Sequence, residues 1–222
     1  MTIQDAYNHW ADSYDADRNL TRDLDAWIVR ETFASRPMEH ALEIGCGTGK
    51  NTRFLAQISR RVTALDFSPG MLRSAREKTA AAPNVLFCRA NLLHPWPLPA
   101  ASVNWVICDL VLEHIADLAA VFAEAFRCLK PGGSFFIAEL HPFRQYSGSK
   151  ANFQMGAQVF EVDAFIHHVS DFLKAGQSNG LMLDDLQERW HAEDQGQIPR
   201  IITFQFRKPE GGVASPGGCK VE

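Results

Sequence analysis

The residues best suited to chemistry are three alternating glycines with an acidic residue before them. Glu43, Gly45, Gly47 and Gly49 form the pattern E-x-G-x-G-x-G, where a predicted strand meets a predicted helix. Glycines allow positive φ and let backbone N–H groups approach a ligand closely. The segment therefore predicts a nucleotide-binding loop.

Two other nucleotide-binding loops fit this segment less well. A P-loop requires G-x-x-x-x-G-K-[ST], and Gly49-Lys50 matches its end. However, Ile44 stands at its first glycine and Asn51 at its Ser or Thr. A dinucleotide-binding loop requires G-x-G-x-x-G, and Lys50 stands at its third glycine.

A second acidic residue, Asp66, ends the next predicted strand, 23 residues after Glu43. A carboxylate in that place can accept hydrogen bonds from both hydroxyls of a ribose. The alternative, a solvated aspartate at a strand end, fits the isolated residue equally well.

Alternating apolar runs and amphipathic stretches must position these residues. Short apolar runs predict strands over 40–44, 61–65, 85–88, 103–108 and 134–140. Helical patterns lie between them, over 51–59, 69–80 and 117–129. In the second of these helices, Ser68 is the expected N-cap and Pro69 the first helical residue. The alternation predicts an α/β fold with a doubly wound parallel sheet.

The first 39 residues predict helices. Ile3, Tyr7, Trp10 and Tyr14 recur at spacings of three and four, which places them on one helix face. A second helical pattern stops near Pro37. These helices lie outside the alternating pattern of the central segment.

The end of the chain differs from the centre. A helix is predicted over 169–175, and then two strands over 181–190 and 200–206 with no helix between them. That order predicts an antiparallel hairpin at a sheet edge. The Gly- and Pro-rich tail, 208–222, is expected to be flexible, whereas 141–167 has no clear pattern.

Composition narrows the function classes. The 222 residues are 46% hydrophobic and 22% charged, which is typical of one globular domain. The chain has 22 Lys and Arg residues and 26 Asp and Glu residues, which gives a net charge of −4. This negative charge disfavours a nucleic-acid partner. Without a leader-like or long apolar segment, we expect a cytoplasmic protein with no membrane partner. The five cysteines include no C-x-x-C pair, so we expect reduced thiols and no metal site.

The glycine loop and Asp66 resemble the cofactor motifs of class I S-adenosylmethionine-dependent methyltransferases. The chain is most similar to the methyltransferase type 11 branch, which includes quinone- and biotin-biosynthesis enzymes. Further stretches that match in the expected order are 67–72, 88–92, 96–99, 106–115 and 127–133. The resemblance covers about residues 40–140. It implies a Rossmann-like sheet of seven strands, mostly parallel with one antiparallel strand, and an N-terminal helical cap.

The resemblance also implies S-adenosylmethionine as cofactor, S-adenosylhomocysteine as product, and no metal. By resemblance, Asp66 binds the ribose, Phe67 packs on the adenine, and Tyr14 closes over the methionine end. Many relatives have Asp where this chain has Asn91, an amide that can still donate and accept at an adenine edge. The cofactor-binding residues so implied are Tyr14, Glu43, Gly45, Cys46, Gly47, Asp66, Phe67, Met71, Asn91, Leu92 and Cys108.

Polar residues in two loops are candidates for the acceptor site. They follow the fourth and fifth predicted strands or lie further on, at His114, His141, Arg144, Tyr146, His167 and His168. A histidine beside an acceptor hydroxyl or amine can act as general base, and His141 or His114 is the candidate. Arg144 can pair with a carboxylate substrate, and Tyr146 and His168 are further candidate substrate contacts. Each of these residues also has an ordinary structural or solvated alternative.

We therefore predict one methyltransferase domain over residues 1–207. It is expected to comprise a helical cap (1–39), a cofactor-binding core (40–140), a substrate cover (141–167) and a C-terminal helix and hairpin (168–207). The predicted activity is methyl transfer to a small-molecule acceptor by in-line displacement. The alternatives are a nucleic-acid or protein methyltransferase, a non-catalytic S-adenosylmethionine-binding protein, or a dehydrogenase. Neither the acceptor nor the oligomeric state follows from the sequence.

Overall fold

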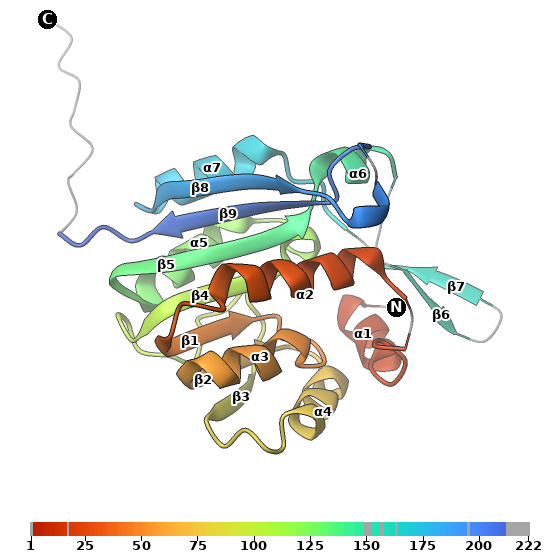
Figure 1. The fold of residues 1–222 in the computed structure, drawn as a ribbon, viewed down its shortest axis with the longest axis horizontal. Helices are drawn as coiled ribbons and strands as arrows, with labels where there is room; N and C mark the ends of the chain where they lie inside the picture. The colour runs from red at the N-terminus through yellow and green to blue at the C-terminus, as the bar shows by residue number, and fades with distance from the viewer. Residues whose placement is uncertain are drawn as a thin grey trace, which may run out of the picture.

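The structure is a computed structural model that describes residues 2–16, 18–148, 152–155, 158–162, 164–194 and 196–211. Most of the predicted flexible tail, 212–222, lies outside the described residues. The remaining chain forms a central sheet with helices on both faces (Figure 1).

Seven strands make one sheet in the order β3-β2-β1-β4-β5-β9-β8. In chain order they are β1 Met38–Ile44, β2 Ser59–Asp66, β3 Val85–Arg89, β4 Val103–Asp109, β5 Leu129–Leu140, β8 Met182–Arg189 and β9 Ile201–Arg207. Strands β1 to β5 pair in parallel, whereas β9 runs antiparallel to both β5 and β8. The predicted seven-stranded sheet with one antiparallel strand is confirmed.

The described residues form seven α-helices and two short 3-10 helices, of which α1 and α2 precede the first strand. They are α1 Ile3–Trp10, α2 Leu20–Phe33, α3 Lys50–Ile58, α4 Pro69–Lys78, η1 Leu112–His114, α5 Leu118–Cys128, α6 Pro142–Tyr146, α7 Val169–Ser178 and η2 Ala192–Asp194. Ser68 caps α4 as predicted, because its Oγ accepts the Met71 N–H at 3.1 Å, and Pro69 opens the helix. This cap directs the chain away from the end of β2.

Two apolar cores lie on opposite faces of the sheet. Neighbouring residues on β5 point to different faces, so that Phe135 packs on Phe122 of α5 and Phe136 packs on Phe33 of α2. Each fully buried side chain of this kind contributes about 1.5–3 kcal/mol of transfer free energy. The sheet is therefore a rigid platform for the loops at its edge.

The N-terminal helices divide between two places. Helix α2 packs on the sheet through Leu24, Ile28 and Phe33, whereas α1 lies beyond the ends of the strands, beside α4 (Figure 1). The predicted cap over 1–39 is therefore formed by α1 and the turn after it, while α2 belongs to the sheet layers. Helical periodicity shows an apolar face but not which surface that face covers.

The segment that the sequence left open, 141–167, contains α6 and a two-stranded hairpin of β6 Asn152–Met155 and β7 Gln158–Glu161. After the hairpin, Val162 packs against Ala6 and Trp10. The segment therefore returns to the N-terminal helix α1.

Candidate active site

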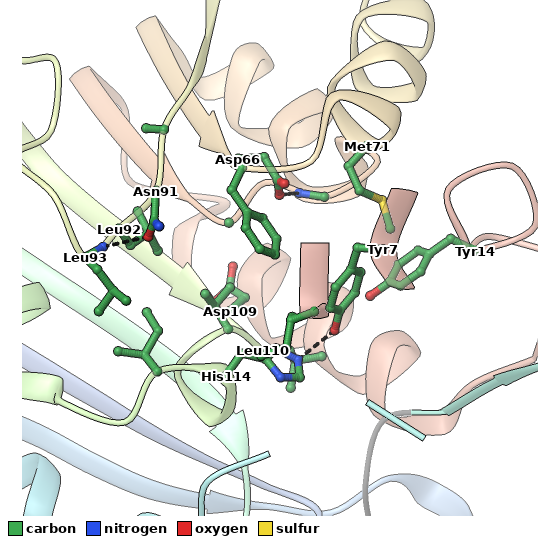
Figure 2. Close-up of a pocket in the computed structure, with 17 residues that line it drawn as sticks. Tyr7, Tyr14, Asp66, Met71, Asn91, Leu92, Leu93, Asp109, Leu110 and His114 are labelled. Atoms are coloured by element: carbon green, nitrogen blue, oxygen red, sulfur yellow. Dashed lines mark hydrogen bonds between the residues drawn. The ribbon is translucent and has the colours of Figure 1, made fainter. Parts of the chain in front are cut away.

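The loops after β1, β2, β3 and β4 enclose a cavity of about 230 Å³ together with α1 (Figure 2). We call it the main cavity. It brings together nine of the residues predicted from the sequence, namely Tyr14, Gly45, Gly47, Asp66, Phe67, Met71, Asn91, Leu92 and His114. Sequence reasoning missed Ile3, Tyr7, Ala90, Leu93, Asp109, Leu110, Val111 and Ile115. Six of these eight residues are apolar, and Ala90, Leu93 and Ile115 directly adjoin predicted residues in the sequence.

The glycine loop has the backbone geometry that its sequence predicts. Gly45, Gly47 and Gly49 have φ of 70°, 52° and 79°. The Gly45 and Cys46 N–H groups donate to the Leu65 carbonyl at 2.8 and 2.9 Å, which fixes the loop against β2. A Cβ at Gly45 would lie 2.2 Å from the Val111 side chain, so only glycine fits there.

Asp66 lies at the end of β2 with both carboxylate oxygens facing backbone donors. One oxygen accepts the Gly47 N–H at 2.9 Å and the other accepts the Ser68 N–H at 2.8 Å. Burial raises the pKa of Asp66 to about 6, although these N–H donors act in the opposite direction. Each carboxylate oxygen keeps a further lone pair, which suits it to accept ribose hydroxyls.

A smaller cavity of about 60 Å³ adjoins the main cavity, and three acidic residues, Asp25, Glu43 and Asp109, line it together with Arg22 and Lys50. We call it the acidic cavity. In it, the Asn51 side-chain amide donates to Asp25 at 2.9 Å and to Asp109 at 3.2 Å. Burial raises the pKa of both aspartates. Among the described residues, the Oδ1 atoms of Asp25 and Asp109 are buried without a hydrogen-bond partner. Buried carboxylate oxygens of this kind suit a cationic ligand group such as a primary ammonium.

Two of the predicted cofactor residues support this acidic cavity from behind the glycine loop. Glu43 accepts the Thr52 hydroxyl at 2.5 Å, and burial raises its pKa to about 8. Cys46 is buried and lines the same small cavity. Their position favours a role in holding the loop against α3.

An aromatic wall closes the main cavity on the side of α1. The Tyr7 hydroxyl lies 2.7 Å from His114 Nε2, and the Tyr7 and Tyr14 ring centroids are 6.4 Å apart (Figure 2). Burial raises the pKa of Tyr7 well above its usual value, so the phenol stays protonated. The phenol and His114 Nε2 therefore share a hydrogen bond whose donor is set by the His114 tautomer. The faces of buried aromatic rings attract cations, and a sulfonium group is such a cation.

A strained residue follows β4 at the cavity. Leu110 has φ of 57°, which is unusual for a leucine. Its N–H donates to Ala138, and Glu139 accepts the next two N–H groups at 2.9 and 2.8 Å. Burial raises the pKa of Glu139 to about 8. These contacts from β5 hold the strained loop, and no local sequence pattern predicts them.

The structure does not bring His141 to any of the cavities described here. Its Nδ1 accepts the Phe143 N–H at 3.2 Å, and its Nε2 lies 3.1 Å from Glu188. The ring is buried, and its pKa is lowered because burial disfavours the charged form. Both ring nitrogens thus have structural partners, which corrects the expectation that His141 is the general base.

Other predicted residues also lie away from the main cavity. Cys108 is buried within β4, and His167 Nε2 faces the Leu112 and Ile115 carbonyls at 3.1 and 2.7 Å. Tyr146 lies 2.6 Å from His168 Nδ1 and is half exposed. His168 also stands at the N-terminus of α7. These positions favour structural roles, in correction of the expected cofactor and substrate contacts.

Among the predicted acceptor contacts, Arg144 does reach a cavity. It lines a neighbouring space of about 160 Å³, which we call the second cavity.

No group of three or more metal-ligating side chains occurs in the described part of the chain. The described helices include none with the length and apolar character needed to cross a bilayer.

Comparison with known proteins identifies the central segment. Residues 42–137 match the family model of a methyltransferase domain. A malonyl-[acyl-carrier protein] O-methyltransferase of Serratia marcescens is 36% identical over 140 residues, which are 63% of this chain and 53% of the relative. A demethylmenaquinone methyltransferase of Tropheryma whipplei (strain Twist) is 33% identical over 107 residues, or 48% of this chain and 44% of the relative. The chain thus spans about half the length of these relatives.

Solved structures share the fold. The N-methyltransferase NodS from Bradyrhizobium japonicum, in complex with S-adenosylhomocysteine, matches with a TM-score of 0.71 at 17% identity, over 95% of this chain and all of NodS. An S-adenosylmethionine-dependent methyltransferase from Mesorhizobium loti matches with a TM-score of 0.69 at 21% identity, over 86% of this chain and all of the other. At residues 42–137, this chain therefore carries a methyltransferase domain of the class I S-adenosylmethionine-dependent family.

Proposed function

We propose that the protein transfers a methyl group from S-adenosylmethionine to a small-molecule acceptor. The observation that carries the proposal is the continuity of the main cavity with the acidic cavity. Together they present the Asp66 carboxylate, which is placed to accept ribose hydroxyls, and the carboxylate oxygens of Asp25 and Asp109 that have no hydrogen-bond partner among the described residues. A ligand with a ribose at one end and an ammonium at the other fits this arrangement.

The remaining wall suits an adenine ring. Phe67, Leu92 and Ala90 supply apolar surface between the ends of β2 and β3. Asn91 holds its own turn through a 3.0 Å hydrogen bond from the Leu93 N–H to its side-chain oxygen. Its amide nitrogen is then the group oriented to donate to a base edge.

When bound, S-adenosylmethionine supplies a methyl group on a positively charged sulfonium. The task of the chain is to align the acceptor with that methyl group and to exclude water from it. Tyr7, Tyr14 and Leu110 line both the main and the second cavity. We propose that these three residues lie between donor and acceptor and align them.

His114 replaces His141 as the candidate base. It lines the main cavity and contacts Tyr7, which itself lines both cavities. If the acceptor must lose a proton, the Tyr7–His114 pair is placed to take up that proton. For an acceptor that is already ionised, the same pair acts only in positioning.

The names of the relatives support a small acceptor group. The Serratia protein is named for a malonyl group on a carrier protein and the Tropheryma protein for demethylmenaquinone. The net charge of −4 also favours a small acceptor over a polyanion. The cytoplasmic location and the lack of a nucleic-acid or membrane partner remain predictions.

Calorimetric titration with S-adenosylhomocysteine tests the proposal. We expect binding by the wild type and a loss of at least about tenfold in Asp66→Asn, because hydrogen bonds to a charged acceptor contribute about 1.5–3 kcal/mol. Asp12→Asn is the matched control, since Asp12 is highly exposed and pairs with Arg73. No binding by the wild type, or equal affinity of Asp66→Asn and the wild type, would contradict the proposal.

A further inference from the structure

The second cavity differs in charge from the main cavity. Three arginines line it, namely Arg22, Arg144 and Arg200. Among the described lining residues, Glu113 is the acidic one, and its carboxyl is buried, which raises its pKa. A space with this wall attracts anions and repels ammonium groups.

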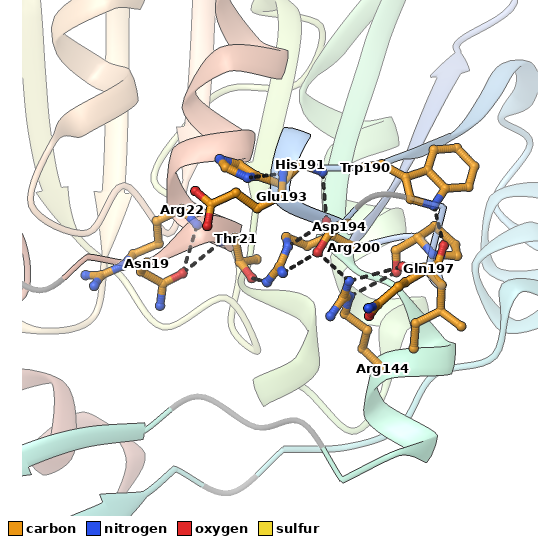
Figure 3. A network of polar contacts seen from close by, with 12 residues as sticks. Asn19, Thr21, Arg22, Arg144, Trp190, His191, Glu193, Asp194, Gln197 and Arg200 are labelled. Carbon is orange, nitrogen blue, oxygen red and sulfur yellow. Dashed lines mark hydrogen bonds and ion pairs between the residues drawn. The ribbon is translucent and has the colours of Figure 1, made fainter.

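Two of the arginines share a single carboxylate (Figure 3). Asp194 accepts from Arg144 at 2.8 Å and from the Nε of Arg200 at 2.9 Å. The Asp194 side chain is 4% exposed, and those of both arginines are 15% exposed. One buried carboxylate cannot neutralise two guanidinium groups, so positive charge remains beside the cavity.

Further contacts hold the guanidinium groups in place. Arg144 donates to the Pro199 carbonyl at 3.1 Å, and Arg200 donates to Thr21 at 3.3 Å. Arg22 lies over the Tyr14 ring, 4.3 Å from its centroid, and donates to the Tyr14 carbonyl. Because these side chains are already ordered, a ligand that binds them loses little further conformational entropy.

We propose that the second cavity binds the methyl acceptor through a carboxylate on the acceptor. This inference rests on the proposed function and names its acceptor class. A carboxylate matches the planar donor geometry of a guanidinium and supplies the missing negative charge. It is also ionised at neutral pH, so it carries the negative charge that pairs with the arginines without first losing a proton. The small volume, about 160 Å³, suits a carboxylate on a short chain or a single ring.

Matched pairs of ligands test the charge requirement. Hexanoate and benzoate are titrated into the protein saturated with S-adenosylhomocysteine, and hexanamide and benzamide serve as neutral equivalents. We expect each acid to bind at least tenfold more tightly than its amide. Equal affinity of acid and amide would overturn the inference, and so would sulfate that binds as tightly as the acids.

Substitutions locate the binding site. Arg144→Gln and Arg200→Gln should each weaken binding of the acids at least tenfold, with little change for S-adenosylhomocysteine. Arg207→Gln is the control, because Arg207 pairs with Asp184 and lines none of the cavities described here. Arg144→Lys and Arg200→Lys keep the charge if the glutamine variants fail to fold, and loss of the bidentate geometry should still weaken binding. Unchanged affinity in the folded variants of both arginines would overturn the inference.

The two proposals fail in different ways. If S-adenosylhomocysteine binds but acids and amides are not distinguished, the acceptor class is wrong and the proposed function stands. If S-adenosylhomocysteine does not bind, the proposed function fails. The same acids titrated without it then still show whether the cavity selects carboxylates.

Discussion

The main cavity and the second cavity are built by different means. In the main cavity, the decisive groups are backbone features: two glycines with positive φ, N–H groups that hold Asp66, and the ends of parallel strands. In the second cavity, they are long side chains from distant segments, with Arg22 on α2, Arg144 on α6 and Arg200 just before β9. Local sequence therefore predicts the glycine loop and Asp66 of the main cavity, whereas the tertiary fold assembles the arginines of the second cavity.

The largest effect should come from the glycine loop, where the backbone itself forms the site. In Gly45→Ala, left-handed strain adds to the clash with Val111, and the free energy of unfolding should fall by about 3 kcal/mol. Gly47→Ala faces open space, so it should cost only about 1 kcal/mol. Because Gly47 lines the main cavity, its variant should nevertheless lose S-adenosylhomocysteine affinity.

Urea unfolding and calorimetry of the two glycine variants separate these effects. The expected pattern is a loss of stability at Gly45 and a loss of binding out of proportion to stability at Gly47. A Gly47→Ala variant with unchanged affinity would show that the loop does not contact the ligand.

The free energy of unfolding should depend on pH because of buried acidic residues in and around the main and acidic cavities. Burial raises the pKa of Glu43 and Glu139 to about 8 and that of Asp66 to about 6. Between about pH 4.5 and 8 the folded chain thus holds more protons than the unfolded chain, and stability falls as pH rises. We expect a loss of at least about 2 kcal/mol between pH 5.5 and 8 in the unliganded protein.

Urea unfolding at several pH values measures this slope. Glu43→Gln should flatten it and raise the stability at pH 8, because an amide oxygen still accepts the Thr52 hydroxyl. Glu39→Gln should leave the slope unchanged, since Glu39 is exposed and pairs with Arg60 at the surface. A stability that rises with pH would contradict the assignment of these raised pKa values.

The smallest effect should come from His141, which lines neither the main nor the second cavity. In His141→Asn, the contact with Glu188 is lost while a capping side chain remains at α6. We expect a loss of about 1 kcal/mol in stability and unchanged affinity for S-adenosylhomocysteine. Thermal unfolding and calorimetry check both values, and a large loss of binding would return His141 to the site.

The same contrast explains what sequence reasoning could predict. The parallel strands β1 to β5, the antiparallel hairpin at the sheet edge and the positions of Gly45 and Asp66 follow from local patterns. The order of the strands in the sheet does not follow from them. His141 was misplaced because a polar residue just after a strand can either face the sheet edge or cap the next helix. Asp25 and Arg200 were missed because each lies within an apolar or charged pattern that is ordinary by itself. Only the packing of α2 and β9 gives them their neighbours.

Tyr14 lines all three cavities, with Arg22 over its ring and bonded to its carbonyl. One side chain is thus a common wall of the three cavities to which we assign the nucleoside, the amino-acid end and the acceptor. A ligand that displaces this ring alters the shape of the neighbouring compartments. If the proposed function holds, we expect the order in which the two substrates bind to depend on the conformation of this single tyrosine.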